Sequence, residues 1–597
     1  MEKKRKYEFD KHKKQRPRKL AKVKPNAFLP EGSNEEILAI EVADLLSKAA
    51  QPPNGASQVF DQPAEQQRPS EIGEEIELEI VALSSTGDGL AYNGAKDHIF
   101  IVPFSVPGDR VLAKPWTWLG KYTNADFIRV IRPASSREGV IPPCPYFAKC
   151  SGCQFQMLPY EKQLEHKRGI VQRAFKHFSG LDQGQMPDVE STMGSPLQYG
   201  YRTKLTPHFT GPPNWEKRHE KPDWKEVPNI GFNMKGRRTV LDIEKCPIGT
   251  DILQEGLKIE RKKVADTISK FRNGATILLR ESTQRSYKDE SKEDVKKEDV
   301  SKEASTKSEA PGTIPSDVND QKLESMAYVP MSGSAETASP TIKLEYPTHA
   351  DLKTYTSDNE ALATEYITTT IDPTTEPPTT KTYQFTNTAG SFFQNNNSIL
   401  GPFTSYVYSK CMPVLPVPHS KPIKYLLDAY CGSGLFTLTL SSHFTSSLGI
   451  DIDGRGISRA RLNASRNNVT NAGFIDADAS ALFADVPYPA DQTVVVIDPP
   501  RKGCDREFLK QLRKYGPRRI IYVSCNVHTQ ARDVGILVNG FRRDAKGRYS
   551  GNTDQELDQY WEAEGLKNYT IESIRGFDFF PQTGHVEGVC VLNELLG

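Results

Sequence analysis

The chain has 597 residues, which is too long for one hydrophobic core and predicts about three or four domains. Its 77 basic and 76 acidic side chains give a formal net charge of +1, so charge alone indicates no nucleic-acid partner. We find no apolar run of about 18 residues and no secretory leader, which predicts a cytoplasmic or nuclear protein that is neither secreted nor membrane-spanning. Nine cysteines in such a chain favour metal binding or catalysis over disulfides.

Residues 1–71 open the chain with two basic runs, at residues 3–6 and 11–24, and with few apolar side chains. Because such a segment cannot bury a core, we expect a disordered basic tail. A nuclear address, a non-specific RNA-binding arm and a solubilising tail are all consistent with this composition.

Residues 72–133 consist of short apolar runs separated by turns, which predicts a small β-barrel. The runs are residues 76–80, 99–102, 110–113 and 126–131. Small barrels of this kind commonly bind single-stranded nucleic acid through basic and aromatic side chains. The candidates here are Lys114, Trp116, Trp118, Lys121 and Tyr122. An inert barrel whose aromatic side chains only pack is the alternative.

Four cysteines follow, with the spacing C-x5-C-x2-C and a fourth about 90 residues later. They are Cys144, Cys150, Cys153 and Cys246. Four thiolates can hold an iron–sulfur cluster or a tetrahedral zinc ion. A close triplet with a distant fourth cysteine favours the cluster, because zinc fingers usually pair two C-x2-C units. Four reduced structural cysteines are the plainer alternative.

Residues 134–382 are expected to form a central α+β domain that carries these cysteines. Residues 160–178 have helical apolar spacing and a basic face. Residues 199–204 interleave aromatic with basic side chains, which suits stacked bases and phosphates. Residues 282–350 are rich in Lys, Glu, Ser, Thr and Pro, which predicts a disordered insertion without a role in the chemistry.

Residues 383–597 alternate apolar runs with helical patterns, which predicts a doubly wound α/β domain. A turn containing Gly432 and Gly434 follows the strand expected at residues 425–429, and Asp451 ends the next strand. An acid about 20 residues after such a turn suits a ribose hydroxyl. The turn lacks the third glycine of dinucleotide sites, which favours S-adenosylmethionine because no pyrophosphate has to fit. Asp478, after a third strand, is placed to meet the adenine amino group.

Two further apolar runs, residues 494–497 and 520–523, predict buried parallel strands. Asp498 follows the first run, and Cys525 lies just beyond the second. Since the carboxyl ends of parallel strands share one edge of an open sheet, both side chains should face one crevice. A carboxylate and a thiol at that edge suggest chemistry, whereas a turn aspartate and a buried cysteine are the plainer alternative.

Four sequence blocks resemble, in the same order, those of the S-adenosylmethionine-dependent RNA 5-methyluridine methyltransferases. The blocks are residues 392–394, 498–503, 524–526 and 580–587. The cysteine pattern is similar to that family's cluster site, and residues 72–133 are similar to its TRAM barrel. The resemblance implies a Rossmann-like methyltransferase domain over residues 383–597. Within the family the chain is most similar to a eukaryotic, fungal-type enzyme that makes 5-methyluridine in the T-loop of tRNA.

The resemblance also implies residue roles. Cys525 would be the nucleophile and Glu587 the proton acceptor, with His585 as a rival base. The cofactor site would comprise Gln394, Tyr430, Gly432, Gly434, Asp451, Asp478 and Asp498. Leu435 stands where relatives often have a polar side chain, which puts one cofactor hydrogen bond in doubt. A [4Fe–4S] cluster would be held by Cys144, Cys150, Cys153 and Cys246.

Three other functions compete with uracil methylation of tRNA. The same reaction on ribosomal RNA is the nearest rival. A non-catalytic RNA-binding or RNA-folding protein would need neither Cys525 nor Glu587. An RNA cytosine-5 methyltransferase would carry a second cysteine after a proline, where this chain has Asp498 followed by two prolines. No obligatory protein partner is inferred.

Overall fold

The computed structural model describes residues 29–50, 72–212, 224–288, 340–413, 421–477, 483, 486–540 and 565–595. The chain divides into two compact units, of which the first comprises Met1–Ser84 and Asp88–Ser135. The second comprises Ser85–Gly87 and Ser136–Gly597. Among the described residues, no helix has both the length and the hydropathy that crossing a membrane requires.

The first unit contains a six-stranded sheet in the order β1-β5-β6-β4-β3-β2. Its strands are β1 (Ile76–Glu79), β2 (Ala82–Leu83), β3 (Gly89–Tyr92), β4 (Ile99–Val102), β5 (Arg110–Trp118) and β6 (Tyr122–Arg132). The four apolar runs that the sequence marked as strands lie in or around β1, β4, β5 and β6. Tyr122, expected to be available for RNA, is instead only 8% exposed and fills a small core.

Helix α2 (Asn34–Ala50) corrects the expectation that residues 1–71 are disordered throughout. Ser33 begins this helix by accepting a hydrogen bond from the backbone N–H of Glu36 at 3.2 Å. Val42 on α2 is 1% exposed and packs in one cluster with Leu90 and Tyr122 of the sheet. Burial of the apolar face of α2 against the sheet stabilises this helix, which the composition of residues 1–71 did not indicate. Both basic runs lie outside the described residues.

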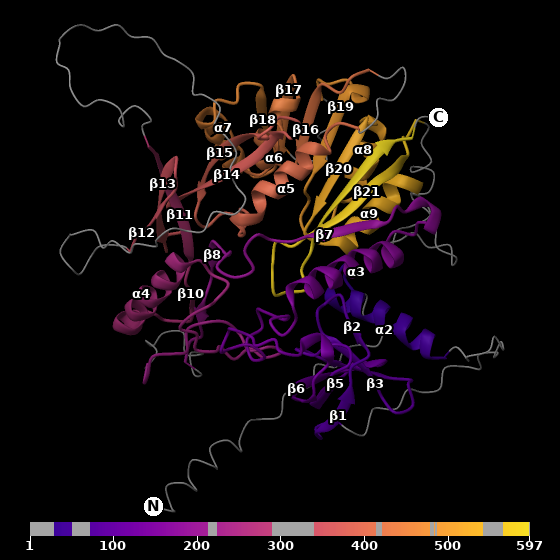
Figure 1. Cartoon of the computed structure of the whole chain (residues 1–597), viewed down its shortest axis with the longest axis vertical. Coiled ribbons are helices and arrows are strands. Elements are labelled where there is room, and N and C mark those ends of the chain that lie inside the picture. The colour runs from indigo at the N-terminus through magenta and orange to yellow at the C-terminus, as the bar shows by residue number, and fades with distance from the viewer. Residues whose placement is uncertain are drawn as a thin grey trace, which may run out of the picture. The chain divides into compact units, whose positions relative to one another are not determined.

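The second unit is built on an eight-stranded sheet in the order β18-β17-β16-β19-β20-β22-β21-β7 (Figure 1). The strands are β7 (Val189–Met193), β16 (Tyr425–Ala429), β17 (Ser446–Asp451), β18 (Ala472–Asp476), β19 (Thr493–Ile497), β20 (Arg519–Ser524), β21 (Tyr569–Phe577) and β22 (Glu587–Glu594). Strand β22 is antiparallel to both neighbours, and the other pairs are parallel. The α/β prediction is therefore confirmed, and the carboxyl ends of the parallel strands share one edge.

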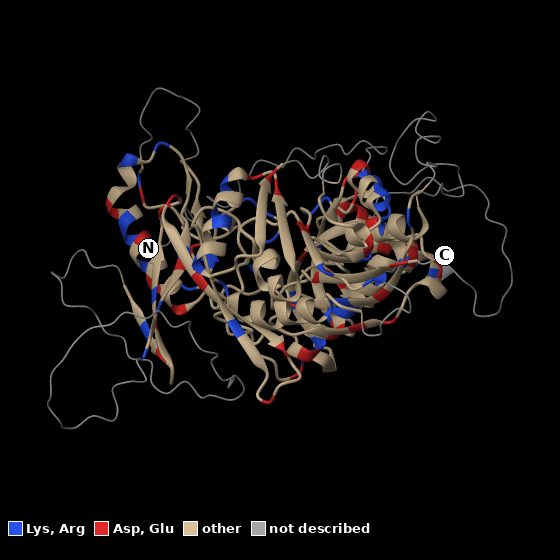
Figure 2. Ribbon diagram, turned by 90° about the horizontal axis from the view of Figure 1, so that it is seen from above, with Lys and Arg blue, Asp and Glu red and all other residues tan. Residues whose placement is uncertain are grey.

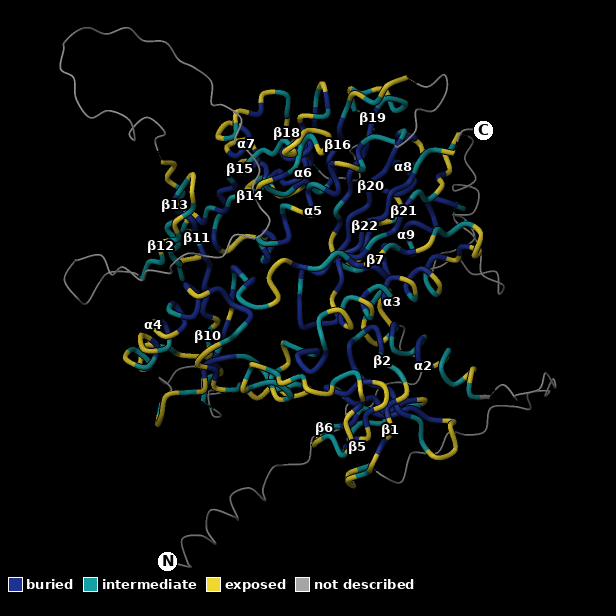
Figure 3. The backbone as a smooth tube through the Cα atoms, in the orientation of Figure 1, coloured by how far each residue is buried: buried dark blue, intermediate teal, exposed yellow. Residues whose placement is uncertain are grey.

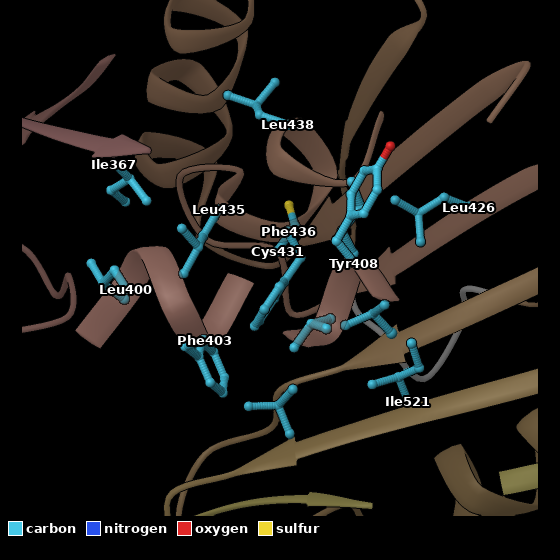
Figure 4. Close-up of a cluster of buried hydrophobic side chains, with 14 of the residues drawn as sticks. Ile367, Leu400, Phe403, Tyr408, Leu426, Cys431, Leu435, Phe436, Leu438 and Ile521 are labelled. Carbon is cyan, nitrogen blue, oxygen red and sulfur yellow. The ribbon is translucent and has the colours of Figure 1, made fainter. Parts of the chain in front are cut away.

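Helices cover both faces of this sheet. Leu427 and Val495 share a buried cluster with α3 (Tyr160–Phe178), α8 (Arg506–Tyr515) and α9 (Val527–Asn539). Leu426 and Ile521 point to the opposite face, where they pack with α5 (Asn397–Ser409), α6 (Leu435–Thr439) and α7 (Gly454–Arg466) (Figure 4). Strands buried on both faces explain the continuous apolar runs of the sequence, and Figure 3 shows these central strands in the colour of buried residues.

The central segment adds a four-stranded sheet in the order β12-β13-β11-β8 and a long hairpin. Its elements are β8 (Lys204–Leu205), β9 (His208–Phe209), α4 (Asp251–Thr267), β10 (Ala275–Thr276), β11 (Leu279–Tyr287), β12 (Ile342–Glu345), β13 (His349–Thr356), β14 (Leu362–Asp372) and β15 (Thr379–Thr388). The expected boundary at residue 383 falls inside β15, and β7 of the same segment joins the large sheet.

Strands β11, β12 and β13 correct the expectation that residues 282–350 are disordered throughout. Residues 289–339 of that range lie outside the described residues. Arg285 stands opposite Asp351 in the β11–β13 ladder, and the two form an ion pair at 2.7 Å. Glu281 pairs with Lys353 across the same strands at 2.7 Å. Because charged side chains pair across these strands, the segment lacks the apolar alternation that marks a strand in sequence.

Gly535 allows α9 to approach the end of α3, because a Cβ there would overlap the backbone carbonyl of Ser179. We expect Gly535→Ala to lower the unfolding free energy by about 1–3 kcal/mol, as overpacking does. Gly169→Ala on α3 is the matched control, since its Cβ would meet only the end of the Arg173 side chain, at 3.2 Å. Denaturant unfolding of both variants measures the difference, and equal midpoints would contradict this account of the α3–α9 contact.

Candidate active site

Cys525, Asp498 and Glu587 are brought to one edge of the large sheet by the strands that carry them. Asp498 follows β19, and Cys525 follows the parallel neighbour β20. Strand β22 runs antiparallel to β20, with Gly588 paired to Ser524. Glu587, the first residue of β22, therefore lies beside Cys525 although 62 positions separate them in the sequence printed above. The predicted juxtaposition of a thiol and a carboxylate is present.

The Cys525 thiol lies in a negative and partly buried environment. Burial, Glu587 and Asp498 raise its pKa to about 12, while the charge and hydrogen bond of Arg501 act in the opposite direction. The free protein therefore holds Cys525 as a thiol at neutral pH. Arg501 is the positive group that favours the thiolate at this site, and the sequence interpretation assigned it no role.

Glu587 is a buried carboxyl without a compensating partner on one oxygen. Its side chain is 2% exposed, and Oε1 has no hydrogen-bond partner among the described residues. Burial and the neighbouring Asp498 raise the pKa of Glu587 well above its usual range. An unpaired buried carboxyl is energetically unfavourable and is typical of functional sites. The rival base, His585, is exposed.

The loops that carry Arg501 and Cys525 are fixed to each other. The Arg501 carbonyl accepts hydrogen bonds from Asn526 Nδ2 and Thr529 Oγ1, both at 3.1 Å. Gly503 has φ +76°, and a Cβ there would lie 2.6 Å from the side chains of Arg532 and Asp533. This turn accordingly needs glycine, and it sets Arg501 next to the start of α9.

The glycine turn after β16 has the backbone shape expected of a nucleotide site. Tyr430, Gly432 and Gly434 have φ of 65°, 53° and 90°, and a Cβ at Gly432 would meet open space. Asp451 Oδ2 accepts the N–H of Gly432 at 2.8 Å, so the acid at the end of β17 also holds the turn. These features fit a nucleoside ligand, because half-buried Asp451 keeps oxygen lone pairs for ribose hydroxyls.

Two further residues near this turn were not identified from the sequence. Asp428, in β16, accepts from the N–H and hydroxyl of Thr437, whereas its Oδ1 has no partner among the described residues. Burial raises the pKa of Asp428 to about 7. Burial, and to a lesser extent the nearby charge of Asp428, also raise the pKa of Asp498 to about 7. Ile452, next to Asp451, is 71% exposed. In the sequence, the only sign that Asp428 belongs to the site is that a charged residue lies within the apolar run of residues 425–429. Asp478 lies outside the described residues.

Gln394 is 9% exposed, and the asparagines that follow it are held by buried groups. Arg280 donates to Asn395 Oδ1 at 3.1 Å and forms a buried ion pair with Glu365. Asn396 Nδ2 donates to the carbonyl of Phe579, just after β21, at 3.1 Å. The segment that carries Gln394 is therefore anchored at the carboxyl edge of the sheet.

The aromatic and basic segment 199–204 differs from the expectation that it faces RNA. Tyr201 is 2% exposed, and its hydroxyl donates to the carbonyl of Pro581 at 3.1 Å. Lys204 Nζ donates to the carbonyls of Gly390 and Ser391, both at 3.1 Å. These two side chains connect parts of the protein, so Tyr201 and Lys204 have structural contacts that need no RNA ligand.

The four cysteines of the predicted cluster are free thiols that influence one another. Burial and the neighbouring thiols raise the pKa of Cys153 and of Cys246 to about 12. The N–H of Gly152 points to Cys150 Sγ at 3.4 Å, a contact that suits a thiolate. The donor chemistry fits a thiolate-bound cluster. Among the described residues, however, no group of three or more His, Cys, Asp or Glu side chains has the arrangement of a metal site.

Comparison with known proteins identifies the family. A family model described as tRNA (Uracil-5-)-methyltransferase matches residues 361–486 and 488–544. The tRNA (uracil(54)-C(5))-methyltransferase of Schizosaccharomyces pombe is 37% identical, over 97% of this chain and 87% of that protein. The Saccharomyces cerevisiae enzyme of the same name is 34% identical, over 87% of this chain and 73% of that protein.

A solved structure has the same fold. The Pyrococcus abyssi tRNA (uracil-54, C5)-methyltransferase in complex with S-adenosyl-L-homocysteine aligns with a TM-score of 0.50 and 21% identity. The alignment covers 87% of this chain and 100% of that one. The identity of 37% and 34% to the two fungal proteins over most of their length shows that the chain belongs to the tRNA (uracil-5-)-methyltransferase family.

Proposed function

We propose that this protein transfers a methyl group from S-adenosylmethionine to C5 of a uridine in the T-loop of tRNA. The observation that carries the proposal is the placement of a thiol, Cys525, beside a buried carboxyl, Glu587, at the ligand-binding edge of the sheet. The two fungal relatives are named for uracil 54 of tRNA, which supports tRNA over ribosomal RNA. A protein that only binds RNA would leave the buried Glu587 carboxyl unexplained.

The reaction needs both side chains because uracil C5 is a poor nucleophile. Addition of the Cys525 thiolate to C6 gives an enolate whose C5 can accept the electrophilic methyl that S-adenosylmethionine supplies. The C5–H bond must then break before the product can leave. Glu587 takes that proton, the C5–C6 double bond forms again, and the Cys525 sulfur leaves C6 as a thiolate.

The electrostatics of the free protein bear on both steps. Burial, Glu587 and Asp498 raise the pKa of the Cys525 thiol to about 12 even with Arg501 beside it, so we infer that binding of the target uridine favours the thiolate. The raised pKa of Glu587 makes it a stronger base once it is ionised than an exposed glutamate would be. The target base must leave its stack to reach this edge.

We infer cofactor contacts from the groups around the glycine turn. Asp451 would bind the ribose hydroxyls, and the exposed apolar surface of Ile452 beside it suits the adenine face. Gln394, Tyr430 and Asp498 complete the proposed site, while Asp478, which the sequence predicts to meet the adenine amino group, lies outside the described residues.

The six-stranded sheet of the first unit is proposed to be a TRAM domain that contributes to RNA binding. Figure 2 shows positions of Lys and Arg interspersed with positions of Asp and Glu along the ribbon, so RNA contacts must depend on local groups. Lys114 and Lys121 are exposed and suit phosphate contacts, while Trp116 and Trp118 are half-buried.

A [4Fe–4S] cluster bound by Cys144, Cys150, Cys153 and Cys246 is a further part of the proposal. It rests on the donor set and on the interaction between the thiols. The four residues would hold the cluster as thiolates, and no step of the methyl transfer requires it. The cluster would join the loop of residues 144–153 to the turn that begins at Cys246.

The function is tested with labelled S-adenosylmethionine and a nucleoside digest of tRNA. We expect label in 5-methyluridine of the T-loop with the wild-type protein. For Cys525→Ala we expect a loss of at least about 1,000-fold, because no other nucleophile can form the adduct. Cofactor affinity should change by less than about twofold, since the thiol adds to uracil. Cys590→Ala, a buried cysteine in β22, is the control. Label in ribosomal RNA alone, or turnover by Cys525→Ala, would contradict the proposal.

Glu587→Gln tests the order of steps. The variant retains the size of the side chain but cannot take the C5 proton, so the methylated RNA should remain attached to Cys525. We expect an adduct that survives denaturing electrophoresis and carries the labelled methyl group. His585→Gln is the matched control and should turn over without accumulating this adduct. Normal RNA binding by Glu587→Gln without any adduct would assign the base role to another group.

Anaerobic purification followed by iron and sulfide analysis tests the cluster. We expect about four irons and four sulfides per chain. Cys246→Ser should remove most of this iron, whereas Cys411→Ser, a buried cysteine outside the set, should not. A protein that contains zinc or no metal would contradict the assignment.

A further inference from the structure

Lys167 is a fully buried cation whose partners lie in the loop that leads to Glu587, and the mechanism above does not use it. Its side chain is 0% exposed, as is that of Asp578, with which it forms an ion pair. Lys167 Nζ also donates to the carbonyl of Phe580 at 3.0 Å. Both partners belong to the loop of residues 578–586, which connects β21 to β22 and ends next to Glu587.

Lys167 is part of a polar row on helix α3 that faces this loop. Tyr160, Gln163 and Lys167 are spaced three and four residues apart, so they lie on one side of the helix. The Gln163 side chain accepts from the N–H of Gln582 at 3.0 Å and donates to its Oε1 at 3.0 Å. Helix α3 therefore binds the loop through contacts with residues 578, 580 and 582.

The backbone of this loop adopts, at Gln582, a conformation that contacts from outside the loop must stabilise. Gln582 has φ +72°, in the left-handed region that residues with a side chain rarely adopt. Its carbonyl accepts from the N–H groups of Gln154 and Phe155, at 2.7 and 3.0 Å. The N–H of Gly584 donates to Gln154 Oε1 at 2.9 Å. Contacts from outside the loop thus fix its path up to the residues just before Glu587.

Stability alone does not account for a fully buried lysine and aspartate. Removing two charges from water is unfavourable, and apolar residues of similar size often stabilise a core as well or better. A buried pair can instead select one conformation among several. Here the selected feature is the path of the loop, and therefore the place of the Glu587 carboxyl relative to Cys525.

We propose that Lys167 is a positioning residue that acts through Asp578 and the loop of residues 578–586 to hold Glu587 within reach of the C5 proton. The inference rests on the proposed function, because it takes Glu587 as the base. Loss of the pair leaves addition of Cys525 to C6 and methyl transfer intact. It slows the step in which the C5–H bond breaks, Glu587 gains the proton and the sulfur–C6 bond opens.

The test uses the full-length protein with Lys167→Met and Asp578→Asn combined, because a single change would leave an unpaired buried charge. We expect turnover to fall about 100-fold, as small displacements of a catalytic group do. The labelled, methylated RNA adduct should accumulate at least severalfold over the wild type in folded protein. The rate of the first methyl transfer in a single turnover should stay within about threefold of the wild-type rate. Gln163→Leu, which releases Gln582 without burying a charge, should show the same adduct more weakly.

Arg519→Met combined with Glu572→Gln is the matched control. Arg519 of this pair is also buried in the large sheet, at 1% exposed, while Glu572 is 21% exposed, and the pair lies at the amino end of β20, away from Cys525. Its loss should lower thermal stability without accumulating adduct. The proposal is overturned if the Lys167 variants lose activity without adduct, or if the Arg519 control accumulates as much. Glu587→Gln is run in parallel, and its failure to form adduct would overturn the base role itself.

Discussion

The active site depends on one strand that runs against its neighbours. Strand β22 lies between β20 and β21 and is antiparallel to both. Its first residue, Glu587, therefore lies at the edge where β19 and β20 end, next to Asp498 and Cys525. If β22 were parallel, its first residue would lie at the opposite edge. The direction of this strand thus brings the proposed base, Glu587, and the proposed nucleophile, Cys525, together.

Burial at this edge sets the chemistry of the groups it brings together. Asp428, Asp498 and Glu587 are acids whose pKa values burial raises, and Arg501 provides the opposing charge. Negative neighbours and burial hold the Cys525 thiol protonated in the free protein. This arrangement fits the proposed reaction if substrate binding precedes thiolate formation.

The parts of the fold that local pattern determines were predictable from the sequence. The expected strand at residues 425–429 coincides with β16, and the expected helix at 160–178 coincides with α3, because clear breakers bound an apolar pattern in both cases. Helix α2 was missed because its stability comes from packing on a sheet. Strands β11 and β13 were missed because they pair charges. The contact between Lys167 and Asp578 joins residues 411 positions apart, and no local signal marks it.

Release of tritium from tRNA whose uridines carry tritium at C5 tests the central claim most directly. Methylation through a Cys525 adduct with Glu587 as base predicts one tritium released for each methyl group transferred by the wild-type protein. It also predicts that Glu587→Gln transfers the methyl group but retains the tritium in its RNA adduct. Tritium release by Glu587→Gln at the wild-type rate, or methyl transfer without any release, would contradict the account.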